Sequence, residues 1–183
     1  LMSLVIVLAS TTFVLGFAGA FFWVSRSPFA GVRIVGKTVT LFFQNSPIIL
    51  LLSLGYLIAT SFVDYSSWVA VCMASIVIGL NNGATGASAL MEAADTLPSG
   101  YTAHRLIGLA SVPLRAAVIN AAKASPVAAF VGVPEMLASL TDVTSFTGEQ
   151  TTTYVLVSVF YLIVVQSVIV LTAFVQRHWQ HHG

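Results

Sequence analysis

The stretch ALMEAADTLPSGYTAHRLIGLASVPL, residues 89–114, is the one long interruption in a chain that is otherwise mostly apolar. Of the 183 residues, 57% are hydrophobic and 7% are charged, and the mean hydropathy is +0.96. Soluble globular domains carry about 25% charged residues, so this composition excludes that class and indicates an integral membrane protein. The stretch therefore predicts a polar connection between membrane-spanning segments.

Membrane-spanning helices are predicted on both sides of this connection. A bilayer core of about 30 Å needs about 20 apolar helical residues. Five stretches meet or approach that length: 3–24, 39–63, 67–90, 112–133 and 152–175. The predicted fold class is an all-α membrane protein with five transmembrane helices. They form one transmembrane domain over residues 1–183, with a cytoplasmic loop at 91–111.

The charged residues predict how the chain is oriented. The net charge of +1 and the few charged side chains exclude a basic surface for nucleic acid. With the N-terminus outside and the C-terminus in the cytoplasm, basic residues gather on the inner side, and Lys123 is the exception. The inner group comprises Arg26, Arg33, Lys37, Arg105, Arg115 and Arg177, whereas the outer turns carry Asp64, Glu135, Asp142 and Glu149.

Small residues in the first and third spans predict close helix packing. Gly16 and Gly19 indicate such a face in the first span, and a second face is predicted from Gly79, Gly83 and Gly86. After the first span, Trp23 is placed as an interfacial aromatic anchor, and residues 25–37 are predicted to form a short basic linker on the cytoplasmic surface.

Polar residues inside the apolar stretches are the candidates for a translocation pathway. Pro47 removes a backbone hydrogen bond, and the preceding polar residues offer replacements, so a kink is expected there. Amides or a lysine facing lipid are costly, which favours positions facing protein or water. Two interpretations stay open for these residues, hydrogen bonding between helices and lining of a pathway. The candidates are Asn45, Ser46, Asn81, Asn82, Asn120 and Lys123.

Catalytic and metal motifs are not found in this sequence. There is no GxxxxGK, no HExxH and no serine, histidine and aspartate set in a plausible aqueous site. The histidines near the C-terminus are interpreted as a solvated tail rather than a metal site. No enzyme activity, no cofactor and no metal are therefore expected.

Three stretches resemble the membrane permeases of ATP-binding cassette (ABC) importers for polar amino acids. LFFQNSPIILLL, 41–52, is similar to the family's Arg-Gly-Thr-Pro and Leu-rich run, with Gln44 in place of the arginine. GLNNGATGASALMEAADTLPSG, 79–100, resembles its Leu-Asn-x-Gly-Ala-Tyr stretch with a closing Val-Pro-x-Gly. KASPVAAFVGVPEML, 123–137, resembles the family's segment ending in Ile-Gly-Val-Pro-Glu-Leu. The last match places an extracytoplasmic turn at Gly132, Pro134 and Glu135.

The resemblance also implies a cytoplasmic loop that docks on the ATPase through a Glu-Ala-Ala motif. In the family this motif follows the Val-Pro-x-Gly, whereas MEAAD precedes Pro98 and Gly100. MEAAD is therefore interpreted as a helix end, and the docking loop as shortened and lacking its glutamate. An alternative alignment, which places Glu92, Ala93 and Ala94 in the Glu-Ala-Ala motif, needs two separate deletions and ranks second. The register from both flanks assigns the loop to Thr102, Ala103, His104, Arg105, Gly108 and Leu109.

Two functions follow from the resemblance. The first is a permease subunit of the bacterial inner membrane, which translocates a polar amino acid or similar solute by alternating access. Its partners are the lipid bilayer, a second permease subunit and, if coupling survives, separate ATPase chains and an extracytoplasmic solute-binding protein. The alternative is a permease-derived subunit that has lost ATPase coupling and serves as a structural adaptor in a larger membrane complex.

Overall fold

The computed structural model describes residues 2–131, 142, 144–146, 148 and 150–181. Every long element within these ranges is helical. In chain order the elements are α1 (Met2–Ser25), α2 (Ala30–Asn45), α3 (Ile48–Phe62), α4 (Ser67–Thr96), α5 (Ala103–Ala124), the 3₁₀ helix η1 (Ser125–Val131) and α7 (Gln150–His181).

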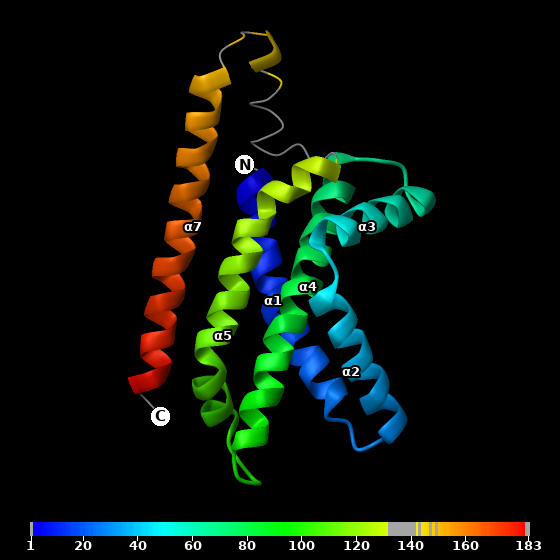
Figure 1. Cartoon of the computed structure of the whole chain (residues 1–183), viewed down its shortest axis with the longest axis vertical. Coiled ribbons are helices and arrows are strands. Elements are labelled where there is room, and N and C mark those ends of the chain that lie inside the picture. Colours follow the sequence, from blue (N-terminus) through cyan, green and yellow to red (C-terminus); the bar gives the residue numbers. More distant parts are fainter. Residues whose placement is uncertain (1, 132–141, 143, 147, 149, 182–183) are drawn as a thin grey trace.

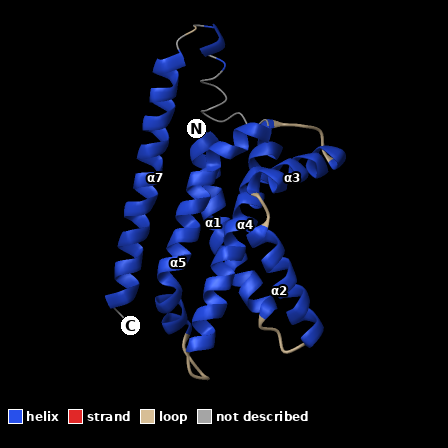
Figure 2. Ribbon diagram, in the orientation of Figure 1, coloured by secondary structure: helices blue, strands red, loops and turns tan. Residues whose placement is uncertain are grey.

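Three helices, α1, α4 and α5, lie side by side at the centre of the molecule (Figure 1). α7 packs along the outer side of α5, and α2 lies on the opposite flank with α3 extending crosswise from its end (Figure 2). The α1–α2 turn, the α4–α5 turn and the C-terminal end of α7 share one end of the molecule, which we call the basic end. The N-terminal end of α1 lies toward the opposite end.

α1 and α4 form the closest helix pair because α4 presents glycines to α1. A Cβ added to Gly79 would overlap the Cβ of Phe13, and one added to Gly83 would lie 2.7 Å from the Cβ of Phe17. This confirms the small face predicted on the third span. The face predicted on the first span makes no contact within the described part of this chain, where nothing lies within 4 Å of a Cβ added to Gly16 or Gly19, so it stays a prediction. In this pair the glycines are on α4, and they face Phe13 and Phe17 of α1.

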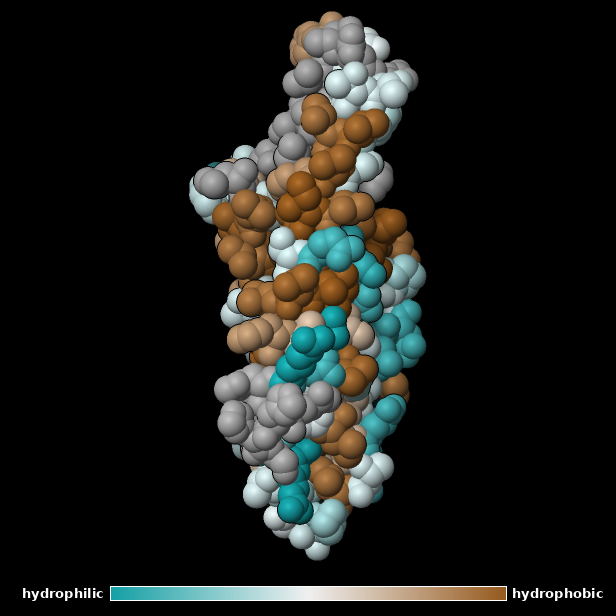
Figure 3. Space-filling model, turned by 90° about the vertical axis from the view of Figure 1, so that its left-hand side faces the viewer, coloured by the Kyte–Doolittle hydropathy of each residue, from teal (hydrophilic) through white to brown (hydrophobic). Residues whose placement is uncertain are grey.

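α4 is the central helix, and α1, α2, α3 and α5 pack against it. Its buried residues include both apolar side chains and the small residues Ser75, Ala84 and Gly86. α7 buries Val164 against Val7 of α1 and Ala122 of α5 and leaves most of its large apolar side chains exposed. Figure 3 shows hydrophobic surface over much of this side of the molecule, interrupted by hydrophilic patches. A surface of this kind suits a lipid environment.

Within the described residues, four helices are long and apolar enough to cross a membrane: α1, α4, α5 with η1, and α7. The second predicted span, 39–63, differs from the expectation. Its residues belong to two helices, α2 and α3, which are bent by 109° at the short break between them and count as a fifth crossing if the pair is one span. α2 begins at Ala30, so most of the expected basic linker over 25–37 is helical. The anticipated kink at Pro47 is thus a sharp break.

The expected loop at 91–111 is also mostly helical. α4 continues to Thr96 and α5 begins at Ala103, which leaves only 97–102 outside the helices. Thr102 caps α5 by accepting a hydrogen bond from Arg105 N at 3.4 Å, and Gly100 adopts a φ of 87° that favours glycine. α5 therefore starts nine residues before the predicted span at 112 and continues past Pro113.

Candidate functional site

The break between α2 and α3 is held by a side chain of α4. Pro47 has no backbone N–H, so the carbonyl of Phe43, four residues earlier, lacks its ordinary helical donor. Asn81 Nδ2 donates to this carbonyl at 2.6 Å and to the carbonyl of Ser46 at 3.1 Å. The amide therefore donates hydrogen bonds to two backbone carbonyls at the break. Such groups need a partner from the protein, because the hydrocarbon core of a bilayer holds no water to bind them.

Further polar side chains surround this break. Ser88 Oγ of α4 donates to Gln44 Oε1 at 2.6 Å, which joins the two helices a second time. Asn45 Nδ2 and Ser46 Oγ donate to carbonyls one turn earlier in α2, at 2.8 and 2.6 Å. We call Gln44, Asn45, Ser46, Asn81 and Ser88 the break cluster. Its groups are neutral amides and hydroxyls, which can hydrogen-bond a polar solute but do not titrate near neutral pH.

The six candidate pathway residues do not all lie together. Asn45, Ser46 and Asn81 meet in the break cluster. Asn82 is buried and donates to the carbonyl of Ile78 in its own helix at 3.0 Å. Asn120 and Lys123 lie on an exposed face of α5. The candidates therefore divide into the break cluster, one buried amide and one polar face on a different helix.

The residues assigned to the docking loop occupy the start of α5 at the basic end. Thr102 is the exposed N-cap, and Ala103 and Arg105 are exposed in the first turn, with His104 half-buried beside them. One turn further, Leu109 is exposed, and no described residue lies within 4 Å of a Cβ added to Gly108. The α4–α5 turn and this first turn of α5 thus present an accessible surface without a separate docking helix between them.

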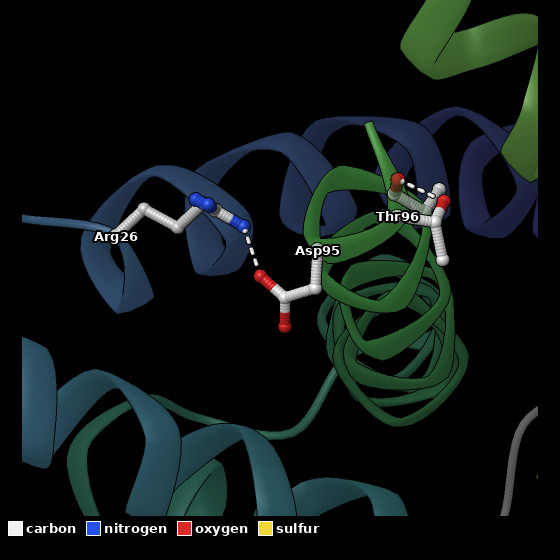
Figure 4. Close-up of polar contacts among 4 residues, drawn as sticks. Arg26, Asp95 and Thr96 are labelled. Carbon is white, nitrogen blue, oxygen red and sulfur yellow. Dashed lines mark hydrogen bonds and ion pairs between the residues drawn. The ribbon is translucent and has the colours of Figure 1, made fainter. Parts of the chain in front are cut away.

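MEAAD lies in the last turns of α4 rather than in a loop. Ala93 and Ala94 are buried against α1 and α5, while Glu92 and Asp95 are exposed. Asp95 Oδ1 accepts a hydrogen bond from Arg26 NH1 at 2.9 Å, an ion pair that joins the ends of α4 and α1 (Figure 4). The same figure shows Thr96 closing α4 through its own hydroxyl, which donates to the carbonyl of Ala93 at 2.8 Å.

Arg115 fastens α7 to α5. Its Nε donates to Thr172 Oγ1 at 3.3 Å, its NH1 to Gln176 Oε1 at 3.2 Å, and its NH2 to the carbonyl of Ile169 at 3.3 Å. All three acceptors are on α7 and follow one another at successive turns from Ile169 to Gln176. A partly buried guanidinium needs such polar partners, and its planar set of donors matches acceptors along a helix flank.

Other predicted site residues lie outside the described residues. Gly132, Pro134 and Glu135 of the expected extracytoplasmic turn are in this group, so their arrangement stays a prediction. Among the residues that the structure does describe, no three His, Cys, Asp or Glu side chains gather as a metal site.

Several contacts were not foreseen from the sequence. Arg26 and Asp95 are 69 positions apart, Gln44 and Ser88 are 44 apart, and Arg115 reaches α7 across more than 50 positions. Considered alone in the sequence, each of these polar residues could equally be in contact with water. The only sequence signal was the placement of an arginine and a glutamine within apolar stretches, which indicates a partner without naming it.

Comparison with known proteins adds one likeness of fold. No protein-family model and no curated protein matches the chain. Among solved structures, the crystal structure of an amino acid ABC transporter with histidines is similar, with a TM-score of 0.79 and 14% sequence identity. The match covers 97% of this chain and 90% of that chain. The predicted all-α, permease-like membrane fold is therefore confirmed.

Proposed function

We propose that the chain is a permease subunit of an ABC importer, which translocates a polar amino acid or a similar small solute by alternating access between two such subunits. The observation that carries this proposal is the likeness of fold to an amino acid ABC transporter over 97% of the chain. The break cluster supports it, because neutral amides and hydroxyls beside a broken helix can exchange hydrogen bonds with a zwitterionic solute.

In this proposal the remaining components are separate chains. ATP would be hydrolysed by two ATPase subunits that contact the α4–α5 turn and the first turn of α5, and an extracytoplasmic binding protein would deliver the solute. The permease would lie in a bacterial inner membrane with its basic end in the cytoplasm. Asn120 and Lys123 remain candidates for the pathway, because their exposed polar face would be costly against lipid and favours water or a second subunit.

A second function is favoured by a specific observation, the brevity of the α4–α5 connection. Only residues 97–102 separate the two helices, so the connection offers a small surface for contact with an ATPase. A coupling element transmits motion through packed contacts. If those contacts are too few, the chain would act as a structural adaptor in a larger membrane complex.

Purification of the chain from its native membrane, with identification of the co-purified polypeptides, separates the two functions. For a permease we expect an ATPase chain in the complex. After reconstitution in vesicles, we also expect uptake of radiolabelled polar amino acids that requires ATP inside the compartment corresponding to the cytoplasm. The same vesicles with ADP are the control. A stable complex without any nucleotide-binding chain, or one without ATP-dependent uptake, would contradict the permease and favour the adaptor.

A further inference from the structure

The lower part of α2, toward the basic end, presents an open face to its surroundings. Of its sixteen residues only Gly36 and Thr40 are buried. A Cβ added to Gly36 would lie 2.8 Å from Val24 Cγ1, and Thr40 Oγ1 lies 3.5 Å from Ser25 Oγ. α2 therefore rests on the end of α1 along a narrow seam, and the rest of its circumference near the basic end is accessible.

Two cations lie on this accessible part of α2. Arg33 and Lys37 are both exposed and are separated by four positions, which makes them neighbours on the helix surface. Arg26, the nearest basic residue in the sequence, is already paired with Asp95 at 2.9 Å. Within the described part of the chain, Arg33 and Lys37 form no ion pair. Their two positive charges are thus available to an external anion.

Apolar and aromatic side chains lie near these cations. On the same side of α2, Ile34 and Leu41 are 64 and 56% exposed, and Leu41 lies one turn beyond Lys37, further from the basic end. Trp23 and Phe29, at the α1–α2 turn, are 79 and 72% exposed and have the composition of an interfacial belt. Because Val24 contacts Gly36, Trp23 lies at the level of the basic pair. A soluble anion would use the cations alone, whereas a phospholipid would use both the cations and the apolar side chains.

We propose that Arg33 and Lys37 form a binding site for the phosphate headgroup of an anionic phospholipid, whose acyl chains lie along Ile34 and Leu41, on the same side of α2 and toward the membrane interior. An arginine and a lysine can share one phosphate, since the guanidinium offers paired donors and the ammonium a compact charge. The proposal depends on the membrane fold and not on transport, so it stands or falls independently of the permease function.

Quenching of Trp23 fluorescence by brominated lipid tests this site. The full chain, with Trp68→Phe and Trp179→Phe so that Trp23 remains the single tryptophan, is reconstituted in phosphatidylcholine bilayers. Dibrominated phosphatidylglycerol or dibrominated phosphatidylcholine is then added in increasing mole fraction. We expect phosphatidylglycerol to bind beside Trp23 at least tenfold more strongly than phosphatidylcholine, since each basic residue near an anionic surface contributes roughly fivefold in affinity.

The variants define the site. The double variant Arg33→Gln, Lys37→Gln should bind phosphatidylglycerol and phosphatidylcholine about equally, so that the ratio of their affinities is close to one. The charge-retaining exchange Arg33→Lys with Lys37→Arg should keep the preference for phosphatidylglycerol, which also shows that the seam with α1 tolerates substitution. Arg177→Gln, at the end of α7 on the other flank, is the matched control and should leave the preference unchanged. Three results would overturn the proposal. The first is an equal preference for phosphatidylglycerol in the wild type and the double Gln variant, and the second is an equal loss of that preference in the Arg177 variant. The third is displacement of the lipid by 10 mM inorganic phosphate.

Discussion

At the residue scale, Asn81 replaces hydrogen bonds that Pro47 and the end of α2 remove. Its amide is one of a few polar groups in the middle of an apolar helix, and both its donors point to backbone carbonyls of the break. Because an unpaired carbonyl in hydrocarbon costs several times more than one in water, the polar side chain and the break depend on each other.

Asn81→Leu is therefore expected to destabilise the fold. It preserves approximate volume and removes two hydrogen bonds, so the free energy of unfolding should fall by about 1–3 kcal/mol. Titration of the purified chain in mixed micelles with sodium dodecyl sulfate measures this change. Asn45→Leu is the control, because Asn45 donates only to a carbonyl of its own helix and is exposed; its effect should stay within about 0.5 kcal/mol. Equal losses from the two variants would contradict the role given to Asn81.

At the element scale, α1 and α4 depend on glycine to pack closely. A Cβ added to Gly83 would lie 2.7 Å from the Cβ of Phe17 and 3.1 Å from the carbonyl oxygen of Val14. Gly83→Ala should therefore lower the free energy of unfolding by about 1–3 kcal/mol, because the helices must move apart. Gly16→Ala on α1 meets no atom within 4 Å and should be neutral or stabilising by up to about 1 kcal/mol. The same micelle titration compares them, and a larger loss for Gly16→Ala would show that the pairing is different.

α7 is attached differently from the central helices. Its buried residues form a narrow stripe against α5 and α1, to which Val164 and the partly buried Val168 contribute. Arg115 adds three hydrogen bonds near the basic end of this stripe. The apolar stripe defines which side of α7 faces the bundle, and the guanidinium defines its position along the helix axis, since its acceptors occur at fixed positions on α7.

The sequence predicted the elements better than their junctions. Apolar stretches long enough to span a bilayer indicated α1, α4, α5 and α7, because length and hydropathy are local properties. The break after Asn45 was foreseen only as a kink, since its angle depends on Asn81, 34 positions after Pro47. α5 started earlier than expected because Thr102 caps a helix whose first turns are polar. In the candidate site, Asn45, Ser46 and Asn81 were identified from their polarity, whereas Gln44 with Ser88 and Arg115 with Thr172 required the three-dimensional structure.

At the scale of the whole molecule, most basic residues lie at one end of the helical bundle. The turns and helix ends at the basic end carry Arg26, Arg33, Lys37, Arg105 and Arg177. The α3–α4 link, which holds Asp64, lies toward the other end. Lys123 is the exception, near the far end of α5. Arginine and lysine in short loops determine orientation, whereas acidic residues such as Glu92 and Asp95 contribute little.

This asymmetry predicts that the basic end faces the cytoplasm. In a Cys72→Ser background, Asp64→Cys in the α3–α4 link should react in intact cells with a maleimide that cannot cross the membrane. Ser99→Cys, exposed in the α4–α5 turn, should react only after the cells are permeabilised. Both cysteines should react fully in permeabilised cells, which controls for their intrinsic reactivity. Labelling of Ser99→Cys in intact cells would reverse the orientation, and because a nucleotide-hydrolysing partner must lie in the cytoplasm, it would also remove the α4–α5 turn as the place where that partner binds.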